Sequence, residues 1–557
     1  MPFDAAFAPY RLAPGLAPAE ALRRAAEAEA APLVVELGER LARDLAERSL
    51  AAIAAGLAAS PEQACQAADG STSGGPGSPR ACLSSARHRE EVAESEAAAI
   101  AAGFAGILLD RPDAPLALGL LGAGFCPECR RAFLSELGGE YGDQLEPLDY
   151  AAMAREALAT ASGAVGFEQV PFGREFWRFR HDQVERAVRD HARAARDRAR
   201  AAGHALEIAA RFETSGPAAF AASRQLDAAV FPAEVPSHST GAGPFRLLRA
   251  VMGRRPCAAE LPEGIPSEAL PRLAGVAAAC GVEIAGHAAE DGLALAPIRR
   301  FARSLATRRD APTPAVPAME CAILYSAECD LWTGGLHRRA VEEAVEALSR
   351  LHVQAPVVLR PSDAPPEATL VLAGASALSA LEAQAVRKRV EGGGTALSFG
   401  AAGAADVTGR PTHELLAEGK PAGAKVGKGT VASLPALVHN PASGLAPGPA
   451  SLEPISRALA ALLGKGRHAA SVVARTPLHV ALCEKDGWVE AHVVSLSGEA
   501  VRGATLFLGV HVTGAAKRAR FLSAEGADER IAMNPSGYSI STVLPAFRGY
   551  AVLSLGS

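Results

Sequence analysis

Over the first three hundred residues, short apolar runs alternate with segments of helical periodicity, and this alternation limits the fold more than any other feature. Helical patterns cover Pro18–Ala30, Arg87–Ala102 and Phe176–Ala202. The runs with strand character are Pro32–Leu37, Gly106–Leu109, Leu206–Phe212, Ala228–Phe231, Arg255–Ala259 and Val282–Ala285. Strand followed by helix, repeated, predicts parallel βαβ units. In a region of this size, a parallel sheet that closes on itself predicts a (β/α)8 barrel of the TIM type, irregular near its start.

Proline density marks where this pattern ends. The segment Asp310–Pro317 contains three prolines, which disfavour helix and suit a domain boundary. Region 318–465 has a compact doubly wound α/β pattern, of the flavodoxin-like kind. Region 469–557 consists of short alternating runs between turn residues, which predict a small antiparallel β-sandwich. We therefore expect three domains, over residues 1–312, 318–465 and 469–557.

Composition and charge narrow the range of partners. The net charge is −5 and 21% of residues are charged, which gives no support for binding to nucleic acids or membrane surfaces. Arginines between Arg174 and Arg200 alternate with acidic residues, so this helix is interpreted as a solvated face. No apolar run reaches the roughly 18 residues of a membrane helix. The start lacks a signal-peptide pattern and nine scattered cysteines fit reduced thiols, so we expect a cytoplasmic protein.

Several familiar motifs do not occur. Gly423–Thr430 has the wrong spacing for a phosphate-binding loop. The sequence contains no Gly-x-Ser-x-Gly elbow, and Gly122-Ala-Gly124 lacks the third glycine of a dinucleotide fingerprint. These absences leave the chemistry to the polar residues at the strand ends.

Polar residues follow the predicted barrel strands at the ends where TIM-barrel enzymes place their chemistry. Cleavage of a glycosidic bond needs two carboxyl groups, one protonated to donate to the leaving oxygen and one ionised. The same residue types could instead hold a metal ion or bind a polyol without chemistry, and a single acid after a strand is often a helix cap. The residues in question are Asp110, Arg111, Glu213, Glu234, Glu260 and His287.

Cysteines supply a candidate metal half-site. Cys126-Pro-Glu-Cys129 has the spacing of two zinc ligands, and Cys82 is a candidate third ligand. A redox role would require a thioredoxin-like setting, which the surrounding sequence lacks. A structural zinc is therefore the one cofactor that these residues suggest.

The order of the motifs resembles the β-galactosidases of glycoside hydrolase family 42 and related hypothetical glycoside hydrolases. The resemblance rests on Asp110 after a strand, on Phe125-Cys-Pro-Glu-Cys-Arg-Arg-Ala-Phe133, and on Phe176-Trp-Arg-Phe-Arg180 opening a long helix. Ala322-Ile-Leu-Tyr325 and Glu391-Gly-Gly-Gly-Thr-Ala-Leu-Ser-Phe-Gly400 resemble that family's second domain. The resemblance implies a barrel, a glutamine-amidotransferase-like domain with a structural role in trimers, and a C-terminal β domain.

Residue by residue, the resemblance implies that Asp110 lies near the family's acid/base position and Glu260 at that of its nucleophile. The family has an Asn-Glu pair where this chain has Leu109-Asp110, so the carboxyl group here is one methylene shorter. The family's metal cluster reads Cys-x-Cys-x-x-Cys with an earlier Cys, and Gly124 replaces the first cysteine of that triplet. Region 318–465 has no cysteine in a nucleophile-elbow context, so we expect no glutaminase activity.

Two functions from different classes follow. The first is a retaining, β-galactosidase-like glycosidase of a homo-oligomer (trimer or dimer), acting on a small soluble carbohydrate without a required cofactor. Asp110 would be the general acid/base, Glu260 the nucleophile, and Arg111, Glu213, Glu234 and His287 would bind sugar hydroxyls. The alternative is a non-catalytic barrel that binds carbohydrate or serves as an assembly subunit, because a fold alone does not confer activity. Aromatic residues, which stack on sugars, make up only 5% of the chain.

Overall fold

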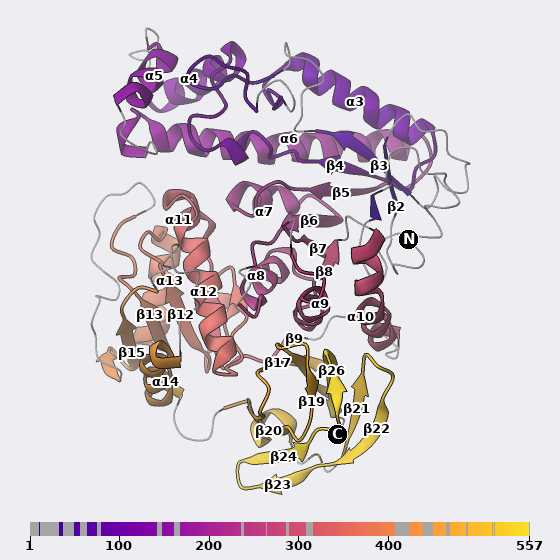
Figure 1. Ribbon diagram of the computed structural model, residues 1–557. Helices are drawn as coiled ribbons and strands as arrows, with labels where there is room; N and C mark the ends of the chain where they lie inside the picture. Colours follow the sequence, from indigo (N-terminus) through magenta and orange to yellow (C-terminus); the bar gives the residue numbers. More distant parts are fainter. Residues whose placement is uncertain are drawn as a thin grey trace. The chain divides into compact units, whose positions relative to one another are not determined.

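The computed structural model divides into two compact units, and Figure 1 labels their elements. Unit 1 comprises Met1–Ala26, Ala30–Pro232 and Arg255–Glu260, and unit 2 comprises Glu27–Glu29, Ala233–Arg254 and Leu261–Ser557. The structure describes residues 10–11, 33–36, 49–55, 64–74, 79–141, 148–160, 167–235, 239–262, 265–285, 289–307, 316–406, 423–437, 449–463, 468–485, 488–514, 516 and 518–555.

A parallel sheet forms the centre of unit 1. Its strands are β1 (Tyr10–Arg11), β2 (Leu33–Glu36), β3 (Ser49–Ala54), β4 (Gly106–Asp110), β5 (Glu207–Arg211), β6 (Ala228–Pro232) and β7 (Cys257–Glu260). Each strand pairs in parallel with the next along the chain. The strand order runs from β1 to β8 (Glu283–Ala285). Strands in chain order with helices between them confirm the predicted (β/α)8 architecture.

Burial on both faces explains why these strands have apolar rather than alternating sequences. Every residue of β4 is buried, including Asp110 at its end. Gly106 at its start is required by close packing, because an added Cβ would lie 2.4 Å from the Glu207 carbonyl oxygen on β5. The short runs of small and branched side chains therefore predict the strand positions well.

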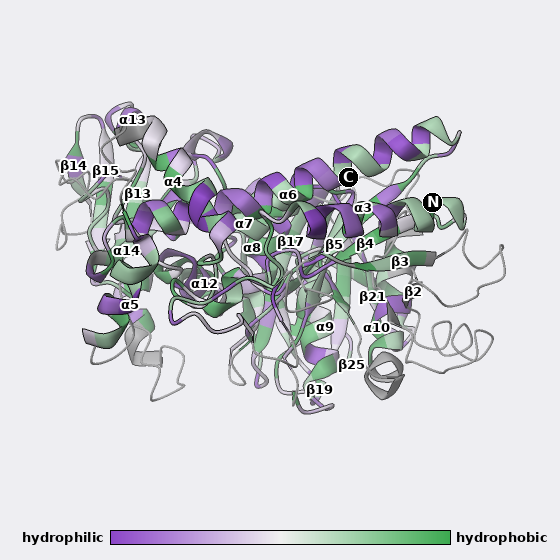
Figure 2. Ribbon diagram, turned by 90° about the horizontal axis from the view of Figure 1, so that it is seen from above, coloured by the Kyte–Doolittle hydropathy of each residue, from purple (hydrophilic) through white to green (hydrophobic). Residues whose placement is uncertain are grey.

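Helices separate these strands along the chain, and the longest of those described is amphipathic. They are α3 (Ala86–Ala101), α4 (Pro127–Tyr141), α5 (Tyr150–Thr160), α6 (Gly173–Ala201) and α7 (Pro217–Ser223), with short 3-10 turns at Leu116–Leu118 and Phe167–Gln169. Along α6, Val184, Val188, Ala192 and Ala195 are buried at helical spacing. Figure 2 shows hydrophilic and hydrophobic segments alternating along α6, as expected for a helix with one solvated face.

Unit 2 begins with α8 (Ala242–Met252), α9 (Leu270–Ala279) and α10 (Ala289–Thr307). A six-stranded sheet follows in the order β11-β10-β12-β13-β15-β14. Its strands are β10 (Cys321–Leu324), β11 (Val357–Val358), β12 (Thr369–Ala373), β13 (Thr395–Phe399), β14 (Ala424–Val426) and β15 (Gly429–Leu434). The associated helices are α11 (Ala327–Trp332), α12 (Leu336–Arg350), α13 (Ala380–Glu391) and α14 (Pro449–Leu463), with a 3-10 turn at Pro361–Asp363.

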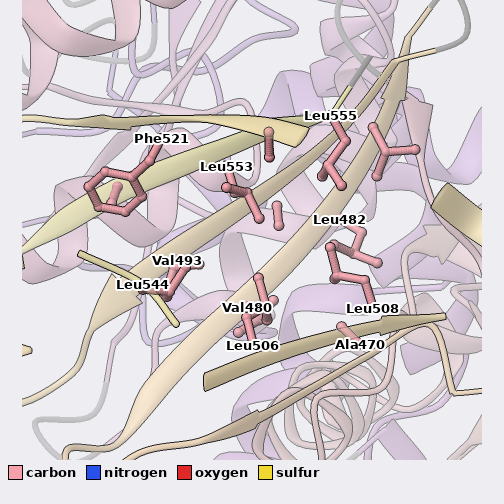
Figure 3. Close-up of a cluster of buried hydrophobic side chains, with 14 of the residues drawn as sticks. Ala470, Val480, Leu482, Val493, Leu506, Leu508, Phe521, Leu544, Leu553 and Leu555 are labelled. Atoms are coloured by element: carbon pink, nitrogen blue, oxygen red, sulfur yellow. The ribbon is translucent and has the colours of Figure 1, made fainter. Parts of the chain in front are cut away.

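The C-terminal part of unit 2 is antiparallel. One sheet has the order β16-β20-β24-β23, a second has the order β22-β21-β26-β18-β17-β9, and β19 pairs with β25. In β17, Leu478, Val480 and Leu482 join the hydrophobic core while the residues between them face away. Figure 3 shows Val480 and Leu482 close to Leu506 and Leu508 of the other sheet. The predicted sandwich is therefore confirmed.

The bounds of those C-terminal strands complete the chain. They are β9 (Val316–Pro317), β16 (Ala470–Val473), β17 (Leu478–Lys485), β18 (Trp488–Ser495), β19 (Ala500–Val501), β20 (Thr505–Gly509), β21 (Arg518–Ser523), β22 (Asp528–Ala532), β23 (Asn534–Ser536), β24 (Ser539–Val543), β25 (Phe547–Arg548) and β26 (Tyr550–Leu555), with one short helix α15 (Val510–Thr513).

Some expectations were incomplete. Strands β1 and β3 were not expected from the sequence, and the helix expected over Pro18–Ala30 lies outside the described residues. The two compact units do not test the three predicted domain boundaries, which stay predictions. Among the described helices, none is both long and apolar enough to span a membrane.

Candidate active site

Three charged side chains meet at the carboxyl ends of strands in unit 1. Asp110, Arg211 and Glu260 are the last residues of β4, β5 and β7. Arg211 Nε and Nη2 each donate to a Glu260 carboxylate oxygen at 2.6 Å, and Arg211 Nη1 donates to Asp110 Oδ1 at 3.2 Å. The structure thus brings the two predicted catalytic carboxyl groups onto one guanidinium, which the sequence analysis had not singled out.

This charged group is largely shielded from water, and its guanidinium is stabilised by the two carboxyl groups. The side chains of Asp110, Arg211 and Glu260 are only 10%, 15% and 18% exposed, so water screens them weakly. Burial alone would lower the pKa of Arg211, but the hydrogen bonds and charges of Glu260 and Asp110 outweigh it and raise that pKa. Short charge-assisted bonds are the stronger ones. Glu260 therefore has the shorter, bidentate contact with Arg211, and Asp110 has the longer one.

Glu213 lies two residues beyond Arg211 and is held from two sides. Arg80, in the loop between β3 and α3, donates from Nη1 and Nη2 to its two carboxylate oxygens at 2.9 and 2.7 Å. Asp113, three residues after Asp110, accepts from the backbone N–H groups of Glu213 and Thr214, both at 2.7 Å. Burial raises the pKa of Asp113 to about 6 against these hydrogen bonds. The loops after three strands thus fix the position of Glu213.

The remaining predicted ligands of a sugar are less closely defined. Arg111 has a φ of 51°, in the left-handed region, and its backbone N–H donates to the Arg211 carbonyl at 2.7 Å. This strained residue turns the chain directly after Asp110. Glu234 follows β6 and belongs to unit 2, and His287 lies outside the described residues. The binding roles of these residues and of Glu213 stay predictions.

Four cysteines form a second cluster in unit 1. The predicted Cys82, Cys126 and Cys129 are joined by Cys65, and all four Sγ atoms lie within 4.8 Å of one another. Sγ–Sγ distances are 3.1 Å for Cys82–Cys126, 3.5 Å for Cys82–Cys129, 3.7 Å for Cys65–Cys126 and 3.9 Å for Cys65–Cys129. A tetrahedral zinc with metal–sulfur bonds of about 2.3 Å separates its sulfurs by about 3.8 Å. The donor set and its spacing therefore fit a structural zinc.

Gly124 explains how this cluster departs from the family pattern. Its backbone N–H donates to Cys65 Sγ at 2.9 Å, and a Cβ on this glycine, whose φ is +96°, would lie 2.7 Å from a Phe176 ring carbon. Where the family that the sequence resembles has a cysteine, this chain has a backbone N–H that donates to Cys65 Sγ. Cys65 is the fourth cysteine of the cluster. The signal that sequence reasoning missed was a fourth cysteine 17 residues before Cys82 (82 − 65 = 17).

Unit 2 also places polar side chains at the ends of parallel strands. His337 accepts from the Ser326 N–H at Nε2 and bonds through Nδ1 to the carbonyl of Ala373, the last residue of β12, both at 2.9 Å. The Tyr325 hydroxyl donates to Asp330 at 2.9 Å. Burial raises the pKa of the Cys329 thiol, on α11, to about 12, so it carries almost no thiolate at neutral pH. The absence of glutaminase activity stays a prediction.

Comparison with known proteins identifies the fold. No protein-family model matches the chain, and no curated protein matches it by sequence. Among solved structures, a β-galactosidase from Bacillus circulans sp. alkalophilus matches with a TM-score of 0.67 at 13% identity, over 100% of this chain and 99% of that one. A catalytic mutant of a GH42 β-galactosidase from G. stearothermophilus matches with a TM-score of 0.66 at 11% identity, over 100% and 98%.

The chain has the fold of the GH42 β-galactosidases. The resemblance read from the motifs is thus confirmed over the full length of the structure. An α-L-fucosidase isoenzyme from Paenibacillus thiaminolyticus matches almost as well, with a TM-score of 0.66 at 12% identity over 96% of this chain and 95% of that one. Because both enzyme types share this fold, the fold alone does not select a substrate.

Proposed function

We propose that the protein is a retaining glycoside hydrolase that acts on a small glycoside. The observation that carries the proposal is Arg211, which holds the carboxyl groups of Asp110 and Glu260 together at the ends of β4 and β7. Two carboxyl groups at short range are what a double displacement at a glycosidic carbon requires. Solved structures with the same fold include a β-galactosidase and an α-L-fucosidase.

The asymmetry of the Arg211 contacts assigns the two roles. Glu260, which accepts two bonds of 2.6 Å from Arg211, is the nucleophile: it attacks the anomeric carbon and forms a glycosyl ester as the bond to the leaving oxygen breaks. Asp110, which Arg211 Nη1 contacts at 3.2 Å, is the general acid that donates a proton to the leaving oxygen. In the second step Asp110 removes a proton from water, which attacks the anomeric carbon and releases Glu260. Forming the ester also removes the charge that competes with Asp110 for Arg211.

We further propose that the four cysteines hold a structural zinc. Cys65, Cys82, Cys126 and Cys129 supply a closed sulfur set, which leaves no position open for substrate. When bound, zinc supplies a cross-link between the loop after β3 and the start of α4. No catalytic step involves it, and the glycosidase needs no other cofactor.

The wider assignments follow from the resemblance and the free thiols. We propose that the α/β part of unit 2 is an amidotransferase-like domain that serves assembly into a homo-oligomer, and that Glu234 and His287 contribute to the sugar site. All nine cysteines are free thiols, which supports a reducing, cytoplasmic setting.

The test is turnover by the purified protein on aryl glycosides, with β-galactoside and α-L-fucoside first. We expect hydrolysis with retention, seen as the anomer first released in a proton NMR time course. The variant Glu260→Gln should lower kcat by about 10⁴-fold or more, because it removes the nucleophile. Its matched control is Glu453→Gln, at an exposed ion pair on α14, which should keep wild-type kcat.

A second variant separates the two carboxyl groups. Asp110→Asn should slow substrates with poor leaving groups far more than activated aryl glycosides, since only the former need the proton. Unchanged turnover in Glu260→Gln would refute the assignment. Sugar binding measured by calorimetry with no turnover on any glycoside would instead favour the non-catalytic barrel.

A further inference from the structure

We propose that Arg80 is a positioning residue that couples metal binding at the four-cysteine site to the placement of Glu213 at the barrel strand ends. The coupling rests on the proposed zinc, and it deepens the proposed sugar site by adding a group behind Glu213. It does not depend on which glycoside is cleaved, or on whether turnover occurs.

One end of the connection is the backbone around Arg80. The N–H of Cys65 donates to the Arg80 carbonyl at 2.7 Å, and the N–H of Arg80 donates to the Ser73 carbonyl at 2.9 Å. Ser73 in turn donates from its N–H to the Cys65 carbonyl at 2.9 Å, and Ala64 forms an antiparallel bridge with Ala81. Cys82 lies two residues further along. Arg80 is therefore tied directly to one metal ligand and lies two residues from another.

The other end is the guanidinium. The Arg80 side chain is 11% exposed and that of Glu213 is 24% exposed, and the pair is bidentate. Bidentate arginine–carboxylate pairs fix orientation as well as charge. Because the Glu213 N–H is also held by Asp113, the carboxylate has little freedom to follow a displaced Arg80. A shift of the loop between Cys65 and Cys82 would therefore break the pair.

The coupling has a defined physical cause. With zinc bound, two loop cysteines are fixed to two cysteines at the start of α4, so the backbone of Arg80 has one position. Without it, the described part of the loop keeps its hydrogen bonds and the packing of Ala64, Ala68 and Ala81, but it loses the cross-link that fixes the orientation of the Arg80 side chain. Because the coupling is thermodynamic, it is reciprocal: loss of the pair must weaken zinc binding by the same factor that loss of zinc weakens the pair.

Reciprocity gives a test that needs no turnover. Zinc affinity of the full-length protein is measured by equilibrium competition with a chromogenic chelator, for wild type, Arg80→Met, Glu213→Gln and the double variant. We expect each single variant to bind zinc about fivefold or more weakly, the lower end of ordinary coupling. The double variant should lose no more than either single one, because both changes remove the same contact. Arg80→Lys, which keeps the charge, should recover part of the loss.

The matched controls are Arg87→Met and Glu91→Gln, which remove an exposed arginine–glutamate pair on α3. They should leave zinc affinity within twofold of wild type. Equal affinity in all variants, or losses that simply add in the double variant, would overturn the coupling. A protein that binds no zinc would overturn it as well. Coupled zinc losses in a protein without glycosidase activity would sustain this inference while refuting the proposed function.

Discussion

The two parallel sheets both place polar groups beyond their strand ends, yet the two sets have opposite electrostatic character. In unit 1, Asp110, Arg211 and Glu260 form a charged group in which each carboxylate contacts a cation. In unit 2, the Tyr325 hydroxyl donates to Asp330, and His337 bonds to the backbone of Ser326 and Ala373. Both sheets therefore have polar residues at their strand ends, and this position alone does not determine what reaction a group can perform.

Residual exposure accounts for the difference. Asp330 and His337 are 1% and 0% exposed, against 7% for Asp110, and Arg211 and Glu260 are half-buried. Burial raises the pKa of Asp330 and lowers that of His337, so both neutral forms are favoured. In unit 1, the neighbouring carboxyl groups instead raise the pKa of Arg211 and stabilise its charge. The carboxyl groups around Arg211 can exchange protons with a ligand, whereas His337 holds the end of β12 to α12.

The largest effect is expected where charge is removed from unit 1. Arg211→Met would leave two shielded carboxylates without their cation, and breaking such a pair costs about 3–5 kcal/mol of unfolding free energy. Urea titration monitored by circular dichroism measures this loss. Arg457→Met, at an exposed pair on α14, is the control and should cost less than about 1 kcal/mol. Equal stabilities of Arg211→Met and Arg457→Met would mean that water solvates the charges around Arg211 to the same extent as surface charges.

A smaller effect is expected for a neutral contact in unit 2. Tyr325→Phe removes one donor from the buried Asp330 carboxyl, which costs about 1–3 kcal/mol because the acceptor cannot reach water. Glycoside turnover should be unchanged, in contrast to the loss expected for Glu260→Gln. A drop in kcat for Tyr325→Phe would show that the two strand-end groups do not differ in function as the comparison requires.

Sequence patterns predicted the positions of β4, β5, β6 and β7 because buried parallel strands are continuous apolar runs. Asp110 and Glu260 were found for the same reason, since each directly ends such a run. Arg211 was missed because it was taken as an interior residue of the run Leu206–Phe212. Its role depends on the sheet register, which brings the ends of β4 and β7 within reach of one side chain on β5 and which one sequence does not reveal.

Long-range contacts account for the other omissions. Arg80 and Glu213 are 133 residues apart, and Cys65 and Cys126 are 61 apart. Cys-x-x-Cys spacing identified two ligands because it is local, whereas the other two come from a loop with no regular pattern. Strand β3, with its sequence Ser-Leu-Ala-Ala-Ile-Ala, was missed because its small residues fit a helix as well as a strand.

The free energy of unfolding should depend on pH in a way that reveals the neutral His337. Because burial lowers the pKa of His337, the unfolded chain binds its proton first, so its contribution to stability is present above about pH 6.5 and lost as pH falls below that value. Protonation would also abolish the acceptor for the Ser326 N–H. Between pH 6.5 and 5, the unfolding free energy of His337→Gln should fall less steeply than that of wild type, by up to about 1 kcal/mol per pH unit. Parallel slopes would contradict a neutral His337.

The smallest effect should come from the one thiol at the strand ends of unit 2. Cys329→Ser keeps a donor for the Gly374 carbonyl, so we expect a loss of no more than about 1 kcal/mol and no change in turnover. In the native protein, iodoacetamide at pH 8 should leave Cys329 unmodified, because the thiol is buried and its pKa is about 12. Mass spectrometry of the digested protein measures the labelling. Rapid labelling of native Cys329 would mean that water reaches these strand ends, and the contrast in burial between the two sheets would then not explain their contrast in charge.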